Sequence, residues 1–315
     1  MKVSVKVPAT TANIGPGFDC LGMALPLYNT ITIEETVLPG TGIDINVISD
    51  NESIDTLSLD HVPTDENSIV YKAVELLYNS IGQTPSELKI TIKSNIPVSR
   101  GLGSSSSVIV GALIAANELL GRPADEVALL SIASEIEGHP DNITPAVVGG
   151  LVISSQEDDG SVVYRKLSWP QEWKITVCVP DFELSTEIAR SVLPKDVSMK
   201  DAVFNAKRMA MFVQAIHTKD SELMKLALQD RLHQPYRMKL VPGLDNIMAE
   251  LKHYENVLGV VLSGAGSSIL IISEKNDVDK IHDLVKEVWA NQNIKCTIKT
   301  LSVENEGAHI ISNED

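Results

Sequence analysis

One junction, between residues 88 and 120, restricts the fold of this chain more than any other part of its sequence. Residues 88–94 (LKITIKS) alternate between apolar and polar, as a half-buried strand does, and residues 108–120 (VIVGALIAANELL) have the length and composition of a helix. The connecting run PVSRGLGSSSS, residues 97–107, contains two glycines and four consecutive serines. It precedes a helix N-terminus, where unpaired N–H groups and the helix dipole favour an anion. The junction therefore predicts a phosphate-binding loop.

The composition of this loop offers several ways to contact a phosphate. Gly101 and Gly103 can adopt positive φ and let a ligand approach the backbone, and the serine hydroxyls add donors or a metal ligand. A tight turn before a serine-capped helix is the structural alternative. The loop residues that we predict to bind a phosphate-bearing cofactor are Pro97, Val98, Ser99, Arg100, Gly101, Leu102, Gly103, Ser104, Ser105, Ser106 and Ser107.

The loop does not match three well-known nucleotide-binding patterns. A Walker A site needs a lysine directly after its last glycine, and the chain contains no Gly-Lys pair, which excludes a P-loop NTPase. The third glycine of a dinucleotide fingerprint would fall at Ser106. The His-Arg-Asp and Asp-Phe-Gly motifs of protein kinases are absent from the sequence.

Composition and charge restrict the class of protein further. With 315 residues, 43% of them hydrophobic and 22% charged, the chain is long enough for two globular domains. A net charge of −16 without a Lys/Arg cluster argues against a nucleic-acid partner. We find neither an apolar run of about 18 residues, as a membrane span needs, nor a signal peptide, and expect a cytoplasmic protein. The three cysteines are far apart, which is typical of reduced thiols.

The order of the predicted elements favours an α+β fold over regular βαβ alternation. In the N-terminal half we predict strands at residues 3–7, 27–34, 43–48, 88–94, 147–154 and 162–167, and helices at 68–81, 104–120 and 125–137. In the C-terminal half we predict strands at 174–179, 258–263, 268–273 and 295–303, helices that begin near 186, 199, 221 and 244, and a helix at 278–291. The polar turn at 156–160 suggests two domains, 1–157 and 158–315, and residues 305–315 read as a loose tail.

Further loops carry polar residues that could complete a site. Residues 8–19 read as a long loop whose Asn13 and Asp19 a rigid Pro/Gly backbone would orient, although a plain connector would have the same composition. Near residue 137 a helix ends with Glu135 and Glu137, which helical spacing puts on different faces, so only one can enter a site. That carboxylate could hold magnesium beside a serine of the phosphate-binding loop.

Three more segments could face a substrate. Residues 263–268 (SGAGSS) form a second Gly/Ser loop between two apolar strands, which a hairpin turn would also explain. Arg190, near the start of a helix, and Arg237, before a Pro-Gly turn, could clamp a carboxylate, although most surface arginines are merely solvated.

Taken together, three strings in this order resemble the three motifs of the GHMP kinases: PATTANIGPGFD at residues 8–19, PVSRGLGSS at 97–105 and SGAGSS at 263–268. The first string and the segment HPDN, residues 139–142, are similar to those of members that phosphorylate L-homoserine. The resemblance covers nearly the whole chain. It implies an N-terminal domain like domain 2 of ribosomal protein S5, a C-terminal ferredoxin-like α/β sandwich and a homodimer.

The resemblance also implies an activity and a role for individual residues. The γ-phosphate of ATP would pass to the side-chain hydroxyl of L-homoserine, on the route to threonine. The loop at 97–107 would wrap the phosphates, Ser104 or Ser105 with Glu135 would hold Mg²⁺, and Asn67 would contact the adenine. The residues implied to hold the amino acid are Asn13, Asp19, Arg190, Arg237 and Gly264, with Asp19 facing its ammonium and the arginines its carboxylate.

The catalytic residues implied by the resemblance are Asn142 at the reacting hydroxyl, Thr186 near the γ-phosphate and Arg190, with Asp141 as an alternative base. An asparagine cannot usefully accept a proton, and phosphoryl transfer depends mainly on positioning and charge stabilisation. We therefore expect catalysis without a strong base. The alternatives are a kinase for mevalonate or another small alcohol, a non-catalytic ATP sensor and, with least support, a Ser-His-Asp hydrolase.

Overall fold

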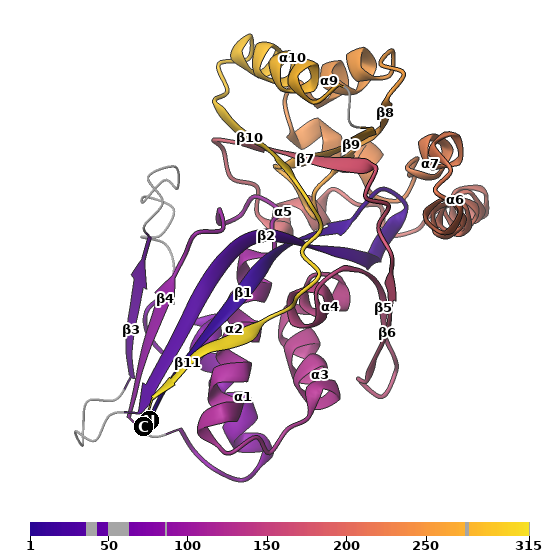
Figure 1. Ribbon diagram of the computed structural model, residues 1–315. Coiled ribbons are helices and arrows are strands. Elements are labelled where there is room, and N and C mark those ends of the chain that lie inside the picture. Colours follow the sequence, from indigo (N-terminus) through magenta and orange to yellow (C-terminus); the bar gives the residue numbers. More distant parts are fainter. Residues whose placement is uncertain (36–42, 50–62, 86, 275–276, 315) are drawn as a thin grey trace.

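The computed structural model describes residues 1–35, 43–49, 63–85, 87–274 and 277–314, and it contains two β-sheets with helices packed against them (Figure 1). Within these described residues the first sheet has seven strands in the order β11-β1-β2-β4-β3, with β5 paired to β2 and β6 paired to β5. Its strands are β1 (Lys2–Asn13), β2 (Gly17–Glu35), β3 (Ile43–Ile48), β4 (Leu88–Lys93), β5 (Leu151–Gln156), β6 (Val162–Leu167) and β11 (His309–Glu314). Among the strands that the structure describes in this sheet, only β3 and β4 pair in parallel. The α+β class is confirmed.

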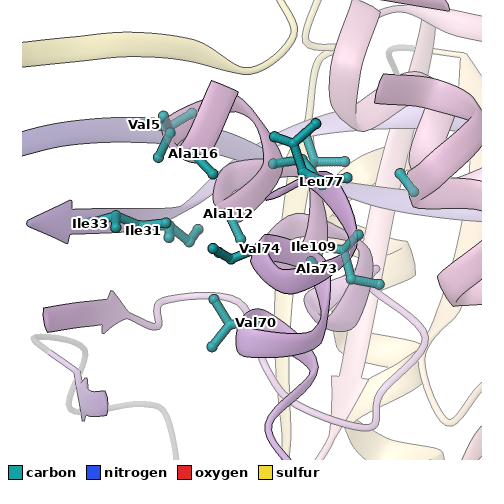
Figure 2. Packing of buried hydrophobic residues seen from close by; sticks show 14 of the residues in the cluster. Val5, Ile31, Ile33, Val70, Ala73, Val74, Leu77, Ile109, Ala112 and Ala116 are labelled. Atoms are coloured by element: carbon teal, nitrogen blue, oxygen red, sulfur yellow. The ribbon is translucent and has the colours of Figure 1, made fainter. Parts of the chain in front are cut away.

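The apolar face of the first sheet is buried beneath helices α1 (Ile69–Ser80), α2 (Ser104–Leu119), α3 (Glu126–Glu137) and α4 (Pro140–Val148). Figure 2 shows Ile31 and Ile33 of β2 among residues of α1 and α2. Both isoleucines are fully buried, and each such side chain contributes about 1.5–3 kcal/mol to the free energy of unfolding. Close packing of α2 on β2 requires Gly111, where a Cβ would lie 2.6 Å from the Cδ1 of Ile31. This packing fixes α2, and with it the phosphate-binding loop, on the sheet.

The second sheet has four antiparallel strands in the order β10-β7-β9-β8. Numbered along the chain this is the order 4-1-3-2, and it confirms the expected ferredoxin-like sandwich. The strands are β7 (Trp173–Pro180), β8 (Val257–Leu262), β9 (Ile269–Glu274) and β10 (Cys296–Leu301). The helices are α5 (Thr186–Ser191), α6 (Met199–Thr218), α7 (Ser221–Ala227), α8 (Gln234–Arg237), the 3₁₀ helix η2 (Met238–Leu240), α9 (Leu244–Leu251) and α10 (Val278–Ala290).

Two predictions near the site, a loop and the start of a strand, are wrong because the chain there forms other regular structure. The predicted loop at 8–19 is mostly strand: β1 runs to Asn13 and β2 begins at Gly17, with a register shift after Pro8 that accommodates the proline. The strand predicted from residue 147 begins later, because residues 140–148 form α4, which starts on Pro140. The site residues of both segments therefore lie on rigid elements.

The predicted domains, 1–157 and 158–315, stay a prediction, and the strand pairing shows where the chain passes between the two sheets. Residue 157 lies between β5 and β6, which pair with each other in the first sheet, so the chain leaves that sheet after Leu167. The predicted loose tail contains β11, which pairs antiparallel with β1, so the end of the chain returns to the first sheet. Among the described residues, no helix combines the length and apolarity needed to cross a membrane.

Candidate active site

A cavity of about 330 Å³ collects most of the predicted site residues. It extends from the N-terminus of α2 to the segments that carry the two predicted arginines. The predicted residues that line it are Asn13, Asp19, Pro97, Val98, Ser99, Arg100, Gly101, Leu102, Gly103, Ser104, Ser105, Asp141, Asn142, Thr186, Arg190, Arg237 and Gly264. Three sequence strings separated by up to about 250 residues thus meet around one space, as one binding site requires.

The two glycines of the predicted phosphate-binding loop are required by close contacts with other segments of the chain. Gly101 and Gly103 have φ of +70° and +66°. A Cβ on Gly101 would lie 2.0 Å from the carbonyl oxygen of Ser263, and one on Gly103 would lie 1.9 Å from Oγ1 of Thr10. The Thr10 N–H donates to Leu102 O at 3.1 Å, and Ser263 Oγ donates to Gly101 O at 2.6 Å. The other two Gly-rich strings therefore hold this loop in shape at the start of α2.

Three residues of the predicted loop contribute to its structure more than to the cavity. Ser106 and Ser107 do not line the cavity: both are buried, and Ser107 Oγ donates to Ser104 O. Arg100 lines it, but its guanidinium donates to the backbone carbonyls of Pro180 and Asp181, at 3.2 and 3.1 Å. These bonds direct its charge to the start of the segment after β7. A phosphate at this loop would be contacted by N–H groups and by the hydroxyls of Ser104 and Ser105.

Glu137, and not Glu135, is the carboxylate that reaches the loop. Its side chain accepts hydrogen bonds from Ser105 Oγ at 3.0 Å and Ser106 Oγ at 2.9 Å, and it lines the cavity. Glu135, the predicted metal ligand, is exposed and does not line the cavity, so of these two carboxylates only Glu137 reaches the loop, and the metal ligand stays a prediction. The reason is the rotation of α3 against α2, which turns Glu137 toward the serines. Hydroxyl and carboxylate oxygens together form a donor set that suits Mg²⁺.

One end of the cavity is apolar and lies away from the arginines. Its walls there come from β3, β4, α1, α2 and the segment before α1, at Val47, Pro63, Ile69, Ile92 and Val108. Such walls suit a flat heterocycle such as adenine. The predicted adenine contact, Asn67, does not line the cavity, because its exposed side chain donates to the carboxylate of Asp65 within a local turn.

The opposite end is built around a charged pair. Arg190 donates two hydrogen bonds to the carboxylate of Asp19, at 2.8 and 3.2 Å, and each side chain remains more than a third exposed. The Asp19 N–H donates to Asn13 Oδ1 at 3.0 Å, and Asn13 Nδ2 donates to Gly264 O at 2.8 Å. Facing anionic and cationic groups match a small zwitterion better than a molecule with one charge.

Comparisons with known proteins show the family of this chain. Models of the GHMP kinase N-terminal and C-terminal domains match residues 68–150 and 212–291. A homoserine kinase of Caldicellulosiruptor saccharolyticus is 43% identical, over 98% of this chain and 97% of its own, and one of Moorella thermoacetica is 39% identical, over 98% and 99%. The chain belongs to the homoserine kinases of the GHMP kinase family. The crystal structure of homoserine kinase from Cytophaga hutchinsonii matches this fold with a TM-score of 0.85 at 27% identity, covering 98% of this chain and 97% of that one.

In this GHMP kinase the second predicted arginine is held by residues that sequence reasoning missed. Arg237 is 2% exposed and donates to Ala189 O at 3.0 Å. Burial, together with the charge of Arg190, lowers its pKa to about 10, so it stays cationic at neutral pH. Both guanidinium groups lie over the ring of Phe18, at 5.2 and 5.6 Å from its centroid. The ring of His233 stacks on Phe18 at 5.3 Å and completes this support.

A chain of hydrogen bonds runs along the wall between the loop and the charged pair. Thr10 Oγ1 donates to Asn142 Oδ1 at 2.8 Å, Asn142 Nδ2 donates to Asp141 Oδ1 at 3.2 Å, and His139 Nδ1 lies 2.5 Å from the same oxygen. Burial alone would lower the pKa of His139, but the hydrogen bond to Asp141 and the neighbouring acidic charges raise it. The sequence contains no signal for the role of His139 beyond its place in the string HPDN.

His139, Asp141 and Asp19 each offer a ligand atom within 4.8 Å of the others. His139 is already bonded to Asp141, and Asp19 to Arg190. We therefore assign no ion to this group.

Proposed function

We propose that this protein transfers the γ-phosphoryl group of ATP to the side-chain hydroxyl of L-homoserine and releases O-phospho-L-homoserine and ADP, a step on the route to threonine. The observation that carries the proposal is the Asp19–Arg190 pair at one end of a cavity that is also lined by the predicted phosphate-binding loop. A zwitterionic amino acid can exchange the contact between these two residues for contacts with itself, with its ammonium at Asp19 and its carboxylate at Arg190 and Arg237. The homodimer and the cytoplasmic location that we expect from the sequence stay predictions.

The residues at the loop fit a magnesium ion that accompanies ATP. Ser105 and Glu137 supply the hard oxygen ligands that Mg²⁺ takes, and Ser104, which also lines the cavity, supplies a further hydroxyl. Bound there with the nucleotide, Mg²⁺ would neutralise charge on the β- and γ-phosphates. The N–H groups at the start of α2 would hold the remaining phosphate oxygens, since the loop has no lysine.

The reaction itself breaks the bond between the γ-phosphorus and the bridging oxygen of ATP, and forms a bond from that phosphorus to the homoserine side-chain oxygen. The proton of the hydroxyl leaves to solvent. Asn142 would orient the hydroxyl, and Thr186 and Arg190 would face the transferred group. Because such a transition state is loose, orientation and charge stabilisation can supply most of the rate without a strong base.

One assay tests the function directly: ADP release from ATP and Mg²⁺, with homoserine, mevalonate, 4-hydroxybutyrate or no acceptor. We expect rapid release with homoserine alone. Mevalonate and 4-hydroxybutyrate carry a carboxylate without an ammonium, so they would leave Asp19 without a partner. Turnover of mevalonate but not homoserine would assign another substrate, and ATP binding with no acceptor-dependent ADP release would indicate a non-catalytic sensor.

The variant Asp141→Asn tests catalysis without a strong base. Asp141 is 1% exposed, and its Oδ1 already accepts from Asn142 and lies next to His139. We expect a modest loss of kcat, much smaller than for loss of a metal ligand. A loss as deep as that of Glu137→Gln, in a variant with the wild-type circular dichroism spectrum, would make Asp141 the base.

A further inference from the structure

Arg100 occupies the middle of the phosphate-binding loop, yet its side chain is used elsewhere. It is 7% exposed, and its Nε and one terminal nitrogen donate to Pro180 O and Asp181 O. The other terminal nitrogen donates to Val98 O at 2.7 Å and lies 3.4 Å from the Glu183 carboxylate. Three of these acceptors belong to the connector between β7 and α5, residues 181–185, or to the residue before it. The rigid fork of a guanidinium can bind neighbouring carbonyls in this way, and a lysine cannot.

The same connector is tied to the loop a second time. The Leu184 N–H donates to Ser99 O at 2.9 Å, so two consecutive loop residues hold both ends of the connector. Phe182 O accepts from Ser267 Oγ at 2.7 Å, which adds a contact from the second Gly/Ser loop. α5 follows immediately, and in Figure 1 it lies between β7 and β2. α5 carries Thr186 and Arg190, which face the acceptor end of the cavity.

We propose that Arg100 is a positioning residue for the acceptor: it sets the place of α5 relative to the phosphate-binding loop. The inference rests on the proposed function, because α5 acts through the homoserine that Arg190 would hold. The loop holds the phosphoryl donor and α5 holds the acceptor, so the Arg100 fork fixes the distance between them. A displacement of about 1 Å between reacting groups can lower the rate on the order of 100-fold. A guanidinium that acted on the phosphates would instead set the affinity for ATP.

Two variants and a control separate these roles. Arg100→Lys keeps the positive charge but loses the forked guanidinium. Arg100→Met keeps an apolar stem of similar length and loses both the charge and the guanidinium. Glu183→Gln is the matched control, because it alters only the long contact of an exposed carboxylate. We expect kcat/KM for homoserine at saturating ATP to fall about 10- to 100-fold in both Arg100 variants. The Kd of a non-hydrolysable ATP analogue, measured by calorimetry with Mg²⁺, should stay near that of the wild type, and Glu183→Gln should resemble the wild type throughout.

Hydrogen exchange of the backbone amides supplies a readout that needs no acceptor. We expect faster exchange over residues 181–191 in both Arg100 variants and no change there in Glu183→Gln. If the wild type fails to phosphorylate homoserine, the proposed function is wrong. The hydrogen-exchange rates of the variants still test whether Arg100 holds α5 in place.

Two results would overturn the inference. In the first, Arg100→Met binds the ATP analogue more weakly, by as large a factor as its kcat/KM falls, while Arg100→Lys keeps the wild-type Kd. That result would mean that the charge of Arg100 acts on the phosphates. The other is a lower melting temperature with unchanged kinetic constants and unchanged exchange at 181–191, which would leave Arg100 a purely structural role.

Discussion

At the scale of single residues, two carboxylates on one helix offer a sharp comparison. Glu137 accepts from Ser105 and Ser106, whereas Glu135 is exposed, two positions away on α3. We expect Glu137→Gln to lower kcat on the order of 100-fold, the loss typical of one preorganised electrostatic contact, and to raise the Mg²⁺ concentration needed for half-maximal rate. Glu135→Gln should keep wild-type values of both. Initial rates over a magnesium titration measure the effect, and equal losses in the two variants would contradict the assignment.

A second residue-scale prediction concerns His233 and pH. Its ring is 0% exposed, Nε2 lies 2.8 Å from Gly15 O, and Nδ1 has no partner, so the neutral form with its proton on Nε2 fits. Burial lowers the pKa of His233 despite the nearby Asp230. As the pH falls below the unfolded value of about 6.5, the unfolded chain binds a proton that the folded chain does not.

The contribution of His233 to the free energy of unfolding of the wild type should therefore decrease from pH 7.5 to 5.5, by at most about 1.4 kcal/mol per pH unit. His233→Gln keeps a donor for Gly15 O and removes the titration, so the stability difference between wild type and variant should shrink as the pH falls. Urea unfolding at several pH values measures it. A difference that stays constant with pH would show that His233 does not titrate between these limits.

How much of the site the sequence predicts depends on how local each signal is. The spacing within residues 97–105 is local, and the loop forms as expected. Choosing between Glu135 and Glu137 depends on how α3 is rotated against α2, which spacing along one helix does not determine. The stack of His233 on Phe18 joins residues more than 200 positions apart, and no pattern within either segment indicates it.

At the scale of elements, the junction from β4 through the loop to α2 needs glycine where other segments of the chain pack closely against it. Gly101 and Gly121 both have positive φ, at +70° and +78°, but a Cβ on Gly101 would meet Ser263 O at 2.0 Å, whereas nothing lies within 4 Å of one on Gly121. Alanine at Gly121 adds only the cost of a left-handed residue, about 1–2 kcal/mol. Alanine at Gly101 should cost about 1–3 kcal/mol more, because the loop or the 263–268 loop must move.

Gly101→Ala should also weaken binding of an ATP analogue, and Gly121→Ala should not. Urea unfolding and calorimetric titration measure the two effects. Equal stability losses in the two variants, with equal nucleotide affinity, would mean that the contact with Ser263 does not shape the loop.

At the scale of the whole molecule, the sequence predicts the two sheets but not where the chain passes between them. Each predicted strand of the second sheet is near its place, because alternation of apolar residues is a local signal. Strand pairing is not local: β5 and β6 flank a polar turn that resembles a domain linker. β11, with the weakly alternating sequence HIISNE, is a strand because it pairs with β1, about 300 residues earlier.

Because β11 pairs with β1, its two adjacent isoleucines should contribute differently to the free energy of unfolding. Ile310 lies opposite Val5 and packs against the first core, whereas Ile311 points to solvent and is 51% exposed. Because Ile310 is only partly buried, Ile310→Ala should lower the free energy of unfolding by about 1–2 kcal/mol, below the range for a fully buried isoleucine. Ile311→Ala should change it by no more than about 0.5 kcal/mol, as is usual at the surface. Urea unfolding of both variants measures the contrast, and a loose tail would predict no loss in either. Since no residue of β11 lines the cavity, kcat of the folded Ile310→Ala enzyme should equal that of the wild type, which separates this structural role from any part in catalysis.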